Sequence, residues 1–476
     1  MSFLTFTFLI FFSAVVLLYY ILPKKTQNAL LLCANCVFYL WAGPAAGVWL
    51  LGAALLSFLC ALAIERGNHR RVWLTLGVLA LFGTLFVFKY LDFAVQSVFA
   101  LAGRPAPSPF ALALPLGISF YSFSLAGYLF DVYRGKCGAE RNLLRFAAFV
   151  SFFPSILSGP INRARELLPQ LERARRFDLS GFKAGLWRFL CGAGKKLVLS
   201  VPMGGVIDAA YAAPWNYSSG AWVVVACLYS IYIYVDFSAY SDIALGAARM
   251  LGLELMENFR APYLSRSAKE FWKKWHISLT SWFREYLYFP LGGSRKGTAR
   301  TRLNILIVFA VSGLWHGAGA AFLIWGLLNG LYQVAGEWTL PARRRLRAAL
   351  HIPEEAWYTA AFQGLVTFAL ITAAWVFFRA GSLSQAVFIF KRILLLFREG
   401  PGLVMLPFPP LQSAVFLLAL GLTAAEDVWI ARGRPFPIER TAFRFWTAAA
   451  LLAAAMLLFG QYGPGFQGQD FVYFDF

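Results

Sequence analysis

The sequence predicts an all-α polytopic membrane protein with roughly ten to twelve transmembrane helices, completed by re-entrant and interfacial helices. Hydrophobic residues make up 59% of the 476 residues, and charged residues only 14%. A soluble domain cannot bury so much apolar surface, and uninterrupted apolar runs of about 18 residues or more are typical of membrane spans. Backbone polar groups in lipid must be satisfied within the span, so runs of this length are helices rather than barrel strands.

The expected spans follow from the apolar runs and the breaks between them. In the first half of the chain they lie near 3–22, 28–42, 45–64, 72–90, 111–133, 197–213 and 221–248. In the second half they lie near 357–378, 411–425 and 445–460. We expect one membrane-embedded domain over 1–476, with its core motifs at 146–338.

Two segments do not have the pattern of a single transmembrane helix. Residues 152–165 are broken by Pro154, Gly159 and Pro160, which indicates a re-entrant or interfacial element buried in protein or lining a cavity. Residues 304–338 are apolar but rich in glycine, and basic residues flank both ends. The second pattern favours two helices that form an in-and-back hairpin and meet near SGLWHG at 312–317.

The net charge of +20 is typical of membrane topology rather than of nucleic-acid binding. Lys and Arg fall in short clusters between the apolar runs, as at 24–25, 66–71, 134–145, 295–302 and 343–347. Basic loops stay in the cytosol and lie near anionic headgroups. These clusters therefore predict the cytosolic ends of the spans.

The stretch KEFWKKWHISLTSWFREYLYFPLGGSR at 269–295 carries a helical pattern over 265–289. Its large side chains recur at three- and four-residue spacing and would share one face: Trp272, His276, Leu279, Phe283 and Tyr286. Glu270 and Lys274 form an i,i+4 pair on another face. The pattern predicts an interfacial helix whose aromatic face is buried. It leaves His276 either as a second catalytic-site residue or as a structural partner of a buried polar group.

His316 is the leading candidate for catalysis. An ionisable residue within an apolar span is a functional candidate by default, and a water-poor setting favours the neutral imidazole. A neutral imidazole suits a general base that activates a hydroxyl. Gly313 and Gly317 would let a substrate pass close to the backbone, and Trp315 and Gly317 are expected in the same tunnel or polar network, a tunnel being what the family resemblance described below implies. The alternative is a histidine that only packs between helices.

Two further groups of residues are weaker candidates. The turn at 291–296 could hold the phosphates of a donor through Gly292, Gly293, Arg295 and Lys296, although positive-inside topology explains the two cations equally well. The motif DFSAYSD at 236–242 places polar groups in or beside a span: Asp236, Ser238, Tyr240 and Asp242. They form either a structural network or a substrate contact. Cys33 and Cys36 form a CxxC without a second pair, so we expect core cysteines and no metal site.

The sequence motifs of this chain together resemble those of the membrane-bound O-acyltransferase family, in its bacterial branch of alginate O-acetylation type. The resemblance rests on FFPSILSGPINR at 152–163, DFSAYSDIALG at 236–246, the 257–297 stretch, SGLWHGAGAAFLIWG at 312–326, WVFFRA at 375–380 and FVYFDF at 471–476. It implies a helical fold around a funnel or tunnel, a catalytic histidine at His316 and a second motif histidine at His276. The chain differs from the alginate-type pattern at Ala239, Gly319 and Ala320.

The resemblance implies an O-acetyltransferase of the bacterial inner, or cytoplasmic, membrane. It would pass acetyl from acetyl-CoA, a donor substrate rather than a bound cofactor, to an extracytoplasmic polysaccharide. An extracytoplasmic hydrolase-like (SGNH) acetyltransferase is the expected protein partner; membrane lipids surround the chain, and no nucleic acid is expected. Two alternatives stay open: a transporter or flippase that moves an intermediate without covalent chemistry, and D-alanyl transfer to teichoic acid.

Overall fold

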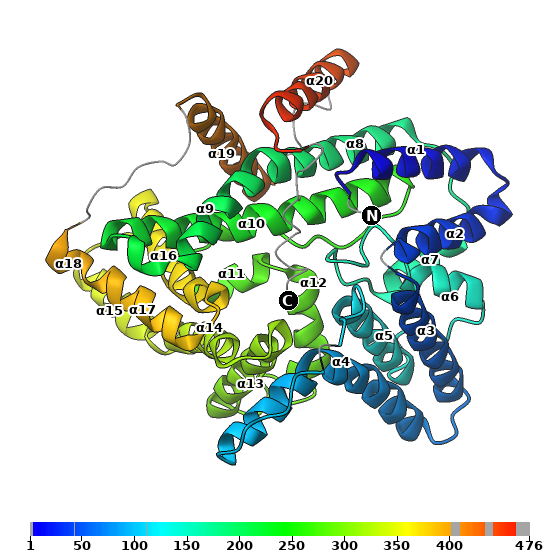
Figure 1. Ribbon diagram of the computed structural model, residues 1–476, viewed down its shortest axis with the longest axis horizontal. Coiled ribbons are helices and arrows are strands. Elements are labelled where there is room, and N and C mark those ends of the chain that lie inside the picture. Colours follow the sequence, from blue (N-terminus) through cyan, green and yellow to red (C-terminus); the bar gives the residue numbers. More distant parts are fainter. Residues whose placement is uncertain (1–2, 42, 111, 401–409, 434–440, 463–476) are drawn as a thin grey trace. The chain divides into compact units, whose positions relative to one another are not determined.

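The computed structural model describes residues 3–41, 43–110, 112–400, 410–433 and 441–462. Within these ranges the chain forms helices and loops and contains no β-strand, which confirms the all-α class (Figure 1). The chain divides into two compact units, the first made of Met1–Cys191 and Tyr240–Glu257, the second of Gly192–Ala239 and Asn258–Phe476. The terminal word at 471–476 lies outside the described residues.

The first half of the chain contains ten α-helices in the described ranges. They are α1 (Phe6–Ile21), α2 (Gln27–Leu40), α3 (Pro44–Glu65), α4 (Arg70–Leu101), α5 (Ile118–Tyr133), α6 (Leu143–Val150), α7 (Ala164–Glu172), α8 (Leu179–Gly194), α9 (Val201–Ala212) and α10 (Ser219–Met250). A π-helical segment, Lys195–Ser200, joins α8 to α9 without a break. As a result, residues 179–212 form one long element rather than the short span expected at 197–213.

The second half of the described chain contains ten more. They are α11 (Ala268–Lys274), α12 (Ile277–Phe283), α13 (Thr298–His316), α14 (Ala320–Trp338), α15 (Leu340–Ala349), α16 (Trp357–Arg379), α17 (Leu383–Leu394), α18 (Leu396–Glu399), α19 (Pro410–Ala431) and α20 (Ala442–Phe459). The hairpin expected over 304–338 is confirmed, because α13 and α14 run side by side and meet just after His316 (Figure 1).

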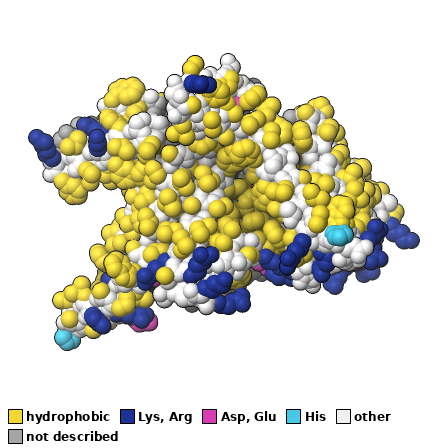
Figure 2. Space-filling model, turned by 90° about the horizontal axis from the view of Figure 1, so that it is seen from below, with side chains coloured by type: hydrophobic (Ala, Val, Ile, Leu, Met, Phe, Trp, Pro, Cys, Tyr) yellow, Lys and Arg dark blue, Asp and Glu magenta, His cyan; other side chains and the backbone are white. Residues whose placement is uncertain are grey.

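Seven helices in the described ranges are long and apolar enough to cross a membrane. They are Pro44–Glu65, Arg70–Leu101, Leu179–Ala212, Ser219–Met250, Trp357–Arg379, Pro410–Ala431 and Ala442–Phe459. This number is lower than the ten to twelve expected. The difference includes the apolar helix α1, which has 16 residues and, at 1.5 Å per residue, is shorter than a hydrocarbon core of roughly 30 Å. Figure 2 shows hydrophobic side chains over most of the face it draws, with Lys and Arg in separate patches.

The irregular segment 151–163 is buried in the first unit, as the sequence predicts. Asn35 on α2 supplies hydrogen bonds that this non-helical backbone needs. Its Nδ2 donates to Ser151 Oγ at 3.0 Å, and its Oδ1 accepts from the Phe153 amide at 3.0 Å. Because unpaired backbone groups are costly in a water-poor interior, this asparagine explains how the segment is tolerated.

Candidate active site

The predicted helix at 265–289 is broken at His276, so the expectation of one continuous helix is wrong. The pieces are α11, α12 and a π-helical turn, Arg284–Tyr288. His276 lies between α11 and α12 in the left-handed conformation, with φ 42° and ψ 54°. This region is sparsely populated by residues other than glycine and is often found at functional sites.

Asn258, which precedes the broken helix, explains the break. Its carbonyl oxygen accepts from the Ile277 amide at 2.9 Å, and its Oδ1 accepts from Ser278 Oγ at 2.7 Å. On the other side of the break, the Arg260 amide donates to the Lys274 carbonyl oxygen at 3.1 Å. These bonds replace helical ones, so the segment at 258–260 ends α11 and begins α12.

The expected burial of the aromatic face is confirmed despite the break. Its members are all buried: Trp272, His276, Leu279, Phe283 and Tyr286. The Glu270–Lys274 pair is also present, with Nζ and Oε1 2.7 Å apart. Burial lowers the pKa of His276 to about 3, so its imidazole is neutral at physiological pH.

His316 is the last residue of α13, and two glycines determine where this helix end lies. A Cβ on Gly326 of α14 would lie 2.2 Å from the Phe309 carbonyl oxygen, and one on Gly313 would lie 2.3 Å from that of Phe322. The backbones of α13 and α14 therefore touch directly. At Gly317 a Cβ would meet the Phe322 ring at 2.2 Å. The space beside Gly313 and Gly317, which we expected a substrate to use, is filled by the hairpin itself.

Three aromatic rings surround the His316 imidazole. The ring centroids of Trp315, Trp325 and Phe378 lie 4.6, 5.0 and 5.2 Å from it, and the His316 side chain is only 2% exposed. Trp325 and Phe378 come from α14 and α16. Phe378 belongs to the WVFFRA word, so the family motifs indicated this residue, although its contact with His316 could not be read from its position in the sequence.

The structure brings the two predicted histidines close to one indole, that of Trp315. Trp315 lies 6.4 Å from the His276 ring, centroid to centroid, and 4.6 Å from the His316 ring. His276 also meets Phe237 of α10 at 4.7 Å in an edge-to-face contact. Aromatic packing therefore places residues 40 positions apart in the chain in one buried cluster.

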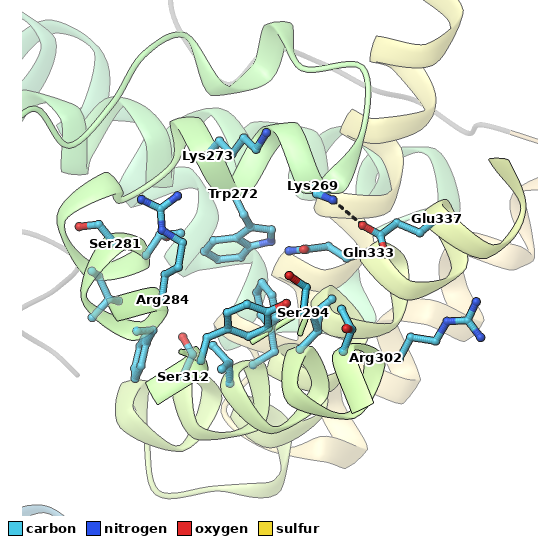
Figure 3. Close-up of a pocket in the computed structure, with 18 of the residues that line it drawn as sticks. Lys269, Trp272, Lys273, Ser281, Arg284, Ser294, Arg302, Ser312, Gln333 and Glu337 are labelled. Carbon is cyan, nitrogen blue, oxygen red and sulfur yellow. Dashed lines mark hydrogen bonds and ion pairs between the residues drawn. The ribbon is translucent and has the colours of Figure 1, made fainter. Parts of the chain in front are cut away.

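A cavity of about 1030 Å³ lies beside this cluster, between α11–α12 and the α13–α14 hairpin (Figure 3). Four basic side chains line it: Lys269, Lys273, Arg284 and Arg302. Figure 3 shows the Trp272 indole in the middle of the lining, with Ser281 and Arg284 on one side and Gln333 on the other. The cavity combines a cationic part with apolar walls.

Neither histidine lines the cavity, but residues close to each of them in the sequence do. Ile277 lines it directly after His276, and Ser312 lines it four residues before His316. Residues four apart share a helical face, so Ser312 points along the face of α13 that carries His316. Trp272, which lines the cavity, also contacts the aromatic cluster around His316, since its ring lies 5.8 Å from that of Trp325. Its Nε1–H also donates to Asn329 Oδ1 at 3.1 Å.

The turn at 291–296, which we expected to bind phosphates, borders this cavity. Its two cations, however, do not line the cavity. Ser294 and Gly297 are lining residues, whereas Arg295 and Lys296 are exposed on the turn between them. Gly292 and Gly293 have positive φ values of 105° and 56°, so the turn itself requires them. The cations that do line the cavity were not singled out in the sequence, where they resemble ordinary surface charges.

The two carboxylates of DFSAYSD belong to separate ion pairs. Asp236 Oδ1 lies 2.7 Å from Lys196 Nζ in the second unit, and both side chains are buried. Asp242, in the first unit, accepts from Arg188 Nε at 3.0 Å, and Arg188 also binds Glu257 at 2.5 Å. The structure thus favours the network interpretation of both acids. Their cationic partners lie 40 and 54 positions away.

The hydroxyl groups of the same word are buried as well. Ser238 Oγ donates to the Val235 carbonyl oxygen at 3.3 Å, within α10. The Tyr240 ring packs edge-on against Phe3 at 5.3 Å in the aromatic core of the first unit. Neither residue lines the cavity described above.

Comparison with known proteins identifies the class of this site. The model of the membrane-bound O-acyltransferase family matches residues 138–380. The chain is 37% identical to a probable alginate O-acetylase of Pseudomonas putida, over 78% of this chain and 75% of that protein. It is 32% identical to a peptidoglycan O-acetyltransferase of Helicobacter pylori, over 78% and 76%.

A more distant similarity extends to another acyl group. The chain is 27% identical to a teichoic acid D-alanyltransferase of Bacillus subtilis, over 51% of this chain and 64% of that protein. The matched residues 138–380 contain the broken helix, both histidines, the α13–α14 hairpin and the cavity. This multi-pass membrane protein is an acyltransferase and belongs to the membrane-bound O-acyltransferase family.

Proposed function

We propose that this acyltransferase moves an acetyl group from cytosolic acetyl-CoA to a hydroxyl of an extracytoplasmic glycan, with His316 as the general base. The observation that carries the proposal is the cavity lined by Ile277, the residue after His276, and by Ser312, one helical turn before His316. The relatives named for alginate and peptidoglycan O-acetylation support an acetyl donor and a glycan acceptor.

The cavity suits the two parts of such a donor. A coenzyme A thioester has an anionic, phosphate-rich head and a long, narrow arm that ends in the acyl group. Lys273, Arg284 and Arg302 supply cations for phosphate oxygens, whereas Lys269 is paired with Glu337. Trp272, Phe309 and Val308 supply an apolar wall for the arm. The head would stay near water while the thioester reaches toward the histidine cluster.

The chemistry needs one proton acceptor at the reacting hydroxyl. The neutral imidazole of His316 takes the hydroxyl proton as the oxygen attacks the thioester carbonyl carbon. The new C–O bond forms, the C–S bond breaks, and the proton passes to the departing thiolate. Trp315, Trp325 and Phe378 exclude water from this step, which protects the thioester from hydrolysis.

His276 acts in this proposal as a positioning residue rather than as a second base. It is neutral and shares the Trp315 indole with His316. Its left-handed backbone and the Asn258 bonds hold that indole, and through it His316, in one orientation.

We infer the membrane location and the acceptor side of the reaction from the family to which the chain belongs. We place the protein in the bacterial inner membrane, with the cationic cavity facing the cytosol according to the positive-inside rule. Acetyl leaves on the opposite face, either directly to a polysaccharide or through an extracytoplasmic hydrolase-like acetyltransferase.

The test of the base uses the purified protein with acetyl-CoA and an alginate oligosaccharide, measuring release of the coenzyme A thiol and mass of the acetylated sugar. His316→Gln is expected to lose about 10²–10⁴ of the rate, because an amide can donate a hydrogen bond but cannot accept the proton. His351→Ala, which changes an exposed loop histidine, is the matched control and keeps full activity. Near-normal acetylation by His316→Gln would refute the base assignment, whereas a wild-type protein that releases no thiol and acetylates no sugar would favour the transporter alternative.

The test of the donor site compares two arginines on α13. Arg302 lines the cavity and Arg300 does not, although the two are only two residues apart. Arg302→Gln is expected to raise KM for acetyl-CoA about tenfold, which corresponds to the loss of one charge-assisted contact, while Arg300→Gln leaves KM unchanged. Equal effects of the two substitutions would show that net charge, not this cavity, attracts the donor.

A further inference from the structure

The helix α15 is basic, amphipathic and solvent-facing. It carries Arg343, Arg344, Arg345 and Arg347 within ten residues, and none of these ten residues, all of them described, is buried. Arg343 Nη2 donates to the Gly336 carbonyl oxygen at 2.6 Å, and this bond joins the first turn of α15 to the end of α14. Arg344 and Arg345 are exposed, whereas Arg347 pairs with Glu354 at 3.4 Å.

An apolar stripe runs along the same helix. Ala342, Leu346, Ala349 and Leu350 follow i, i+4, i+7 and i+8 spacing, so they share one face. Leu346 and Leu350 are 60% and 59% exposed. An amphipathic helix that leaves both its faces uncovered is typical of a segment that lies in a membrane interface.

The neighbours of α15 place it at the end of a membrane span. Trp357 begins α16, one of the seven candidate spans, eight residues after α15 ends. Trp338 and Trp357 flank α15 and are 70% and 80% exposed, and exposed tryptophans are concentrated at the membrane–water interface. Glu337, which lines the donor cavity, lies three residues before α15, so the helix and that end of the cavity are adjacent.

We propose that α15 is an interfacial helix that binds the anionic phospholipid headgroups of the leaflet it faces. The exposed Arg344 and Arg345 side chains pair with phosphate groups, while Leu346 and Leu350 insert between acyl chains. Charge complementarity selects the occupant: a helix with four arginines and no acidic residue fits an anionic lipid surface. The inference does not depend on the reaction, but it places the adjoining end of the cavity at the membrane surface.

Hydrogen–deuterium exchange of the full-length protein in nanodiscs tests the proposal. The α15 amides are compared in phosphatidylcholine alone and in an equal mixture of phosphatidylcholine and phosphatidylglycerol. We expect exchange about tenfold slower in the anionic mixture. Arg344→Gln/Arg345→Gln should abolish that difference, and Arg344→Lys/Arg345→Lys should retain it.

A matched control removes the same charge elsewhere. Arg134→Gln/Lys136→Gln changes two exposed cations of the first unit and should leave the α15 lipid effect intact. Leu346→Ser should speed α15 exchange in the anionic nanodiscs by removing the inserted side chain. Equal exchange in the two lipids, or a lipid effect that survives the glutamine pair, would overturn the proposal. Equal protection in lipid and in detergent would show that contacts within the protein cover the helix.

Discussion

Substituting Gly326 by alanine tests whether backbone contact in the α13–α14 hairpin positions His316, the proposed general base. The added Cβ would lie 2.2 Å from the Phe309 carbonyl oxygen and 3.1 Å from its carbonyl carbon. Both neighbours are backbone atoms, which cannot rotate away as a side chain can. Restoring an ordinary contact of about 3.5 Å requires the helices to separate locally by roughly 1.3 Å.

That displacement sets the expected magnitudes. Overpacking of this kind costs about 1–3 kcal/mol of stability, and we expect the upper part of this range because the clash involves two main chains. His316 ends the helix that must move. Since a misplacement of about 1 Å can lower an enzymatic rate by roughly 10²-fold, Gly326→Ala should lose about two orders of magnitude in acetyl transfer.

Gly336 provides the matched control on the same helix. A Cβ there meets nothing within 4 Å, so Gly336→Ala should keep full activity and gain about 0.5–1 kcal/mol from helix propensity. The assays are thermal unfolding of the purified protein and the thiol-release rate. Wild-type stability and rate in Gly326→Ala, or equal loss in both variants, would refute the claim that the glycine contact positions His316.

Three further predictions concern the surrounding packing and ion pairs. Lys196→Met should cost about 3–5 kcal/mol in denaturant unfolding because it leaves the Asp236 carboxylate buried without its cation, and adding Asp236→Leu should recover most of that loss; a double variant as unstable as the single one would contradict this. Between pH 6.5 and 3 the unfolded chain protonates His276 and the folded chain does not, so stability falls with acidification. At pH 5 the loss is about 2 kcal/mol; His276→Gln should remove this part of the acid sensitivity, and an unchanged pH profile would refute it. Trp272→Ala should destabilise the protein by about 3–5 kcal/mol, whereas Lys273→Ala on the exposed side should change unfolding little; equal effects would show that the buried face is misassigned.

The sequence was sufficient for the class of fold and for the helical hairpin at His316. The apolar runs required membrane helices, because lipid offers the backbone no hydrogen-bond partners and the runs are longer than barrel strands. The glycines around His316 predicted a hairpin that turns beside this residue, and the hairpin is present. These inferences depend on local composition and spacing, which a sequence carries directly.

Only the tertiary structure decided how the site is assembled. The helical spacing at 265–289 predicted one continuous helix, but Asn258 breaks it at His276 by offering hydrogen bonds from a separate loop. Similarly, Asp236 and Asp242 lie in one word of sequence but pair with different cations in different units. Arg302 became a donor-site candidate only because the fold places it in the cavity lining, while Arg295 remains outside that lining. Each outcome depends on which distant groups meet in space, because hydrogen bonds and ion pairs act over a few ångströms whatever the separation along the chain.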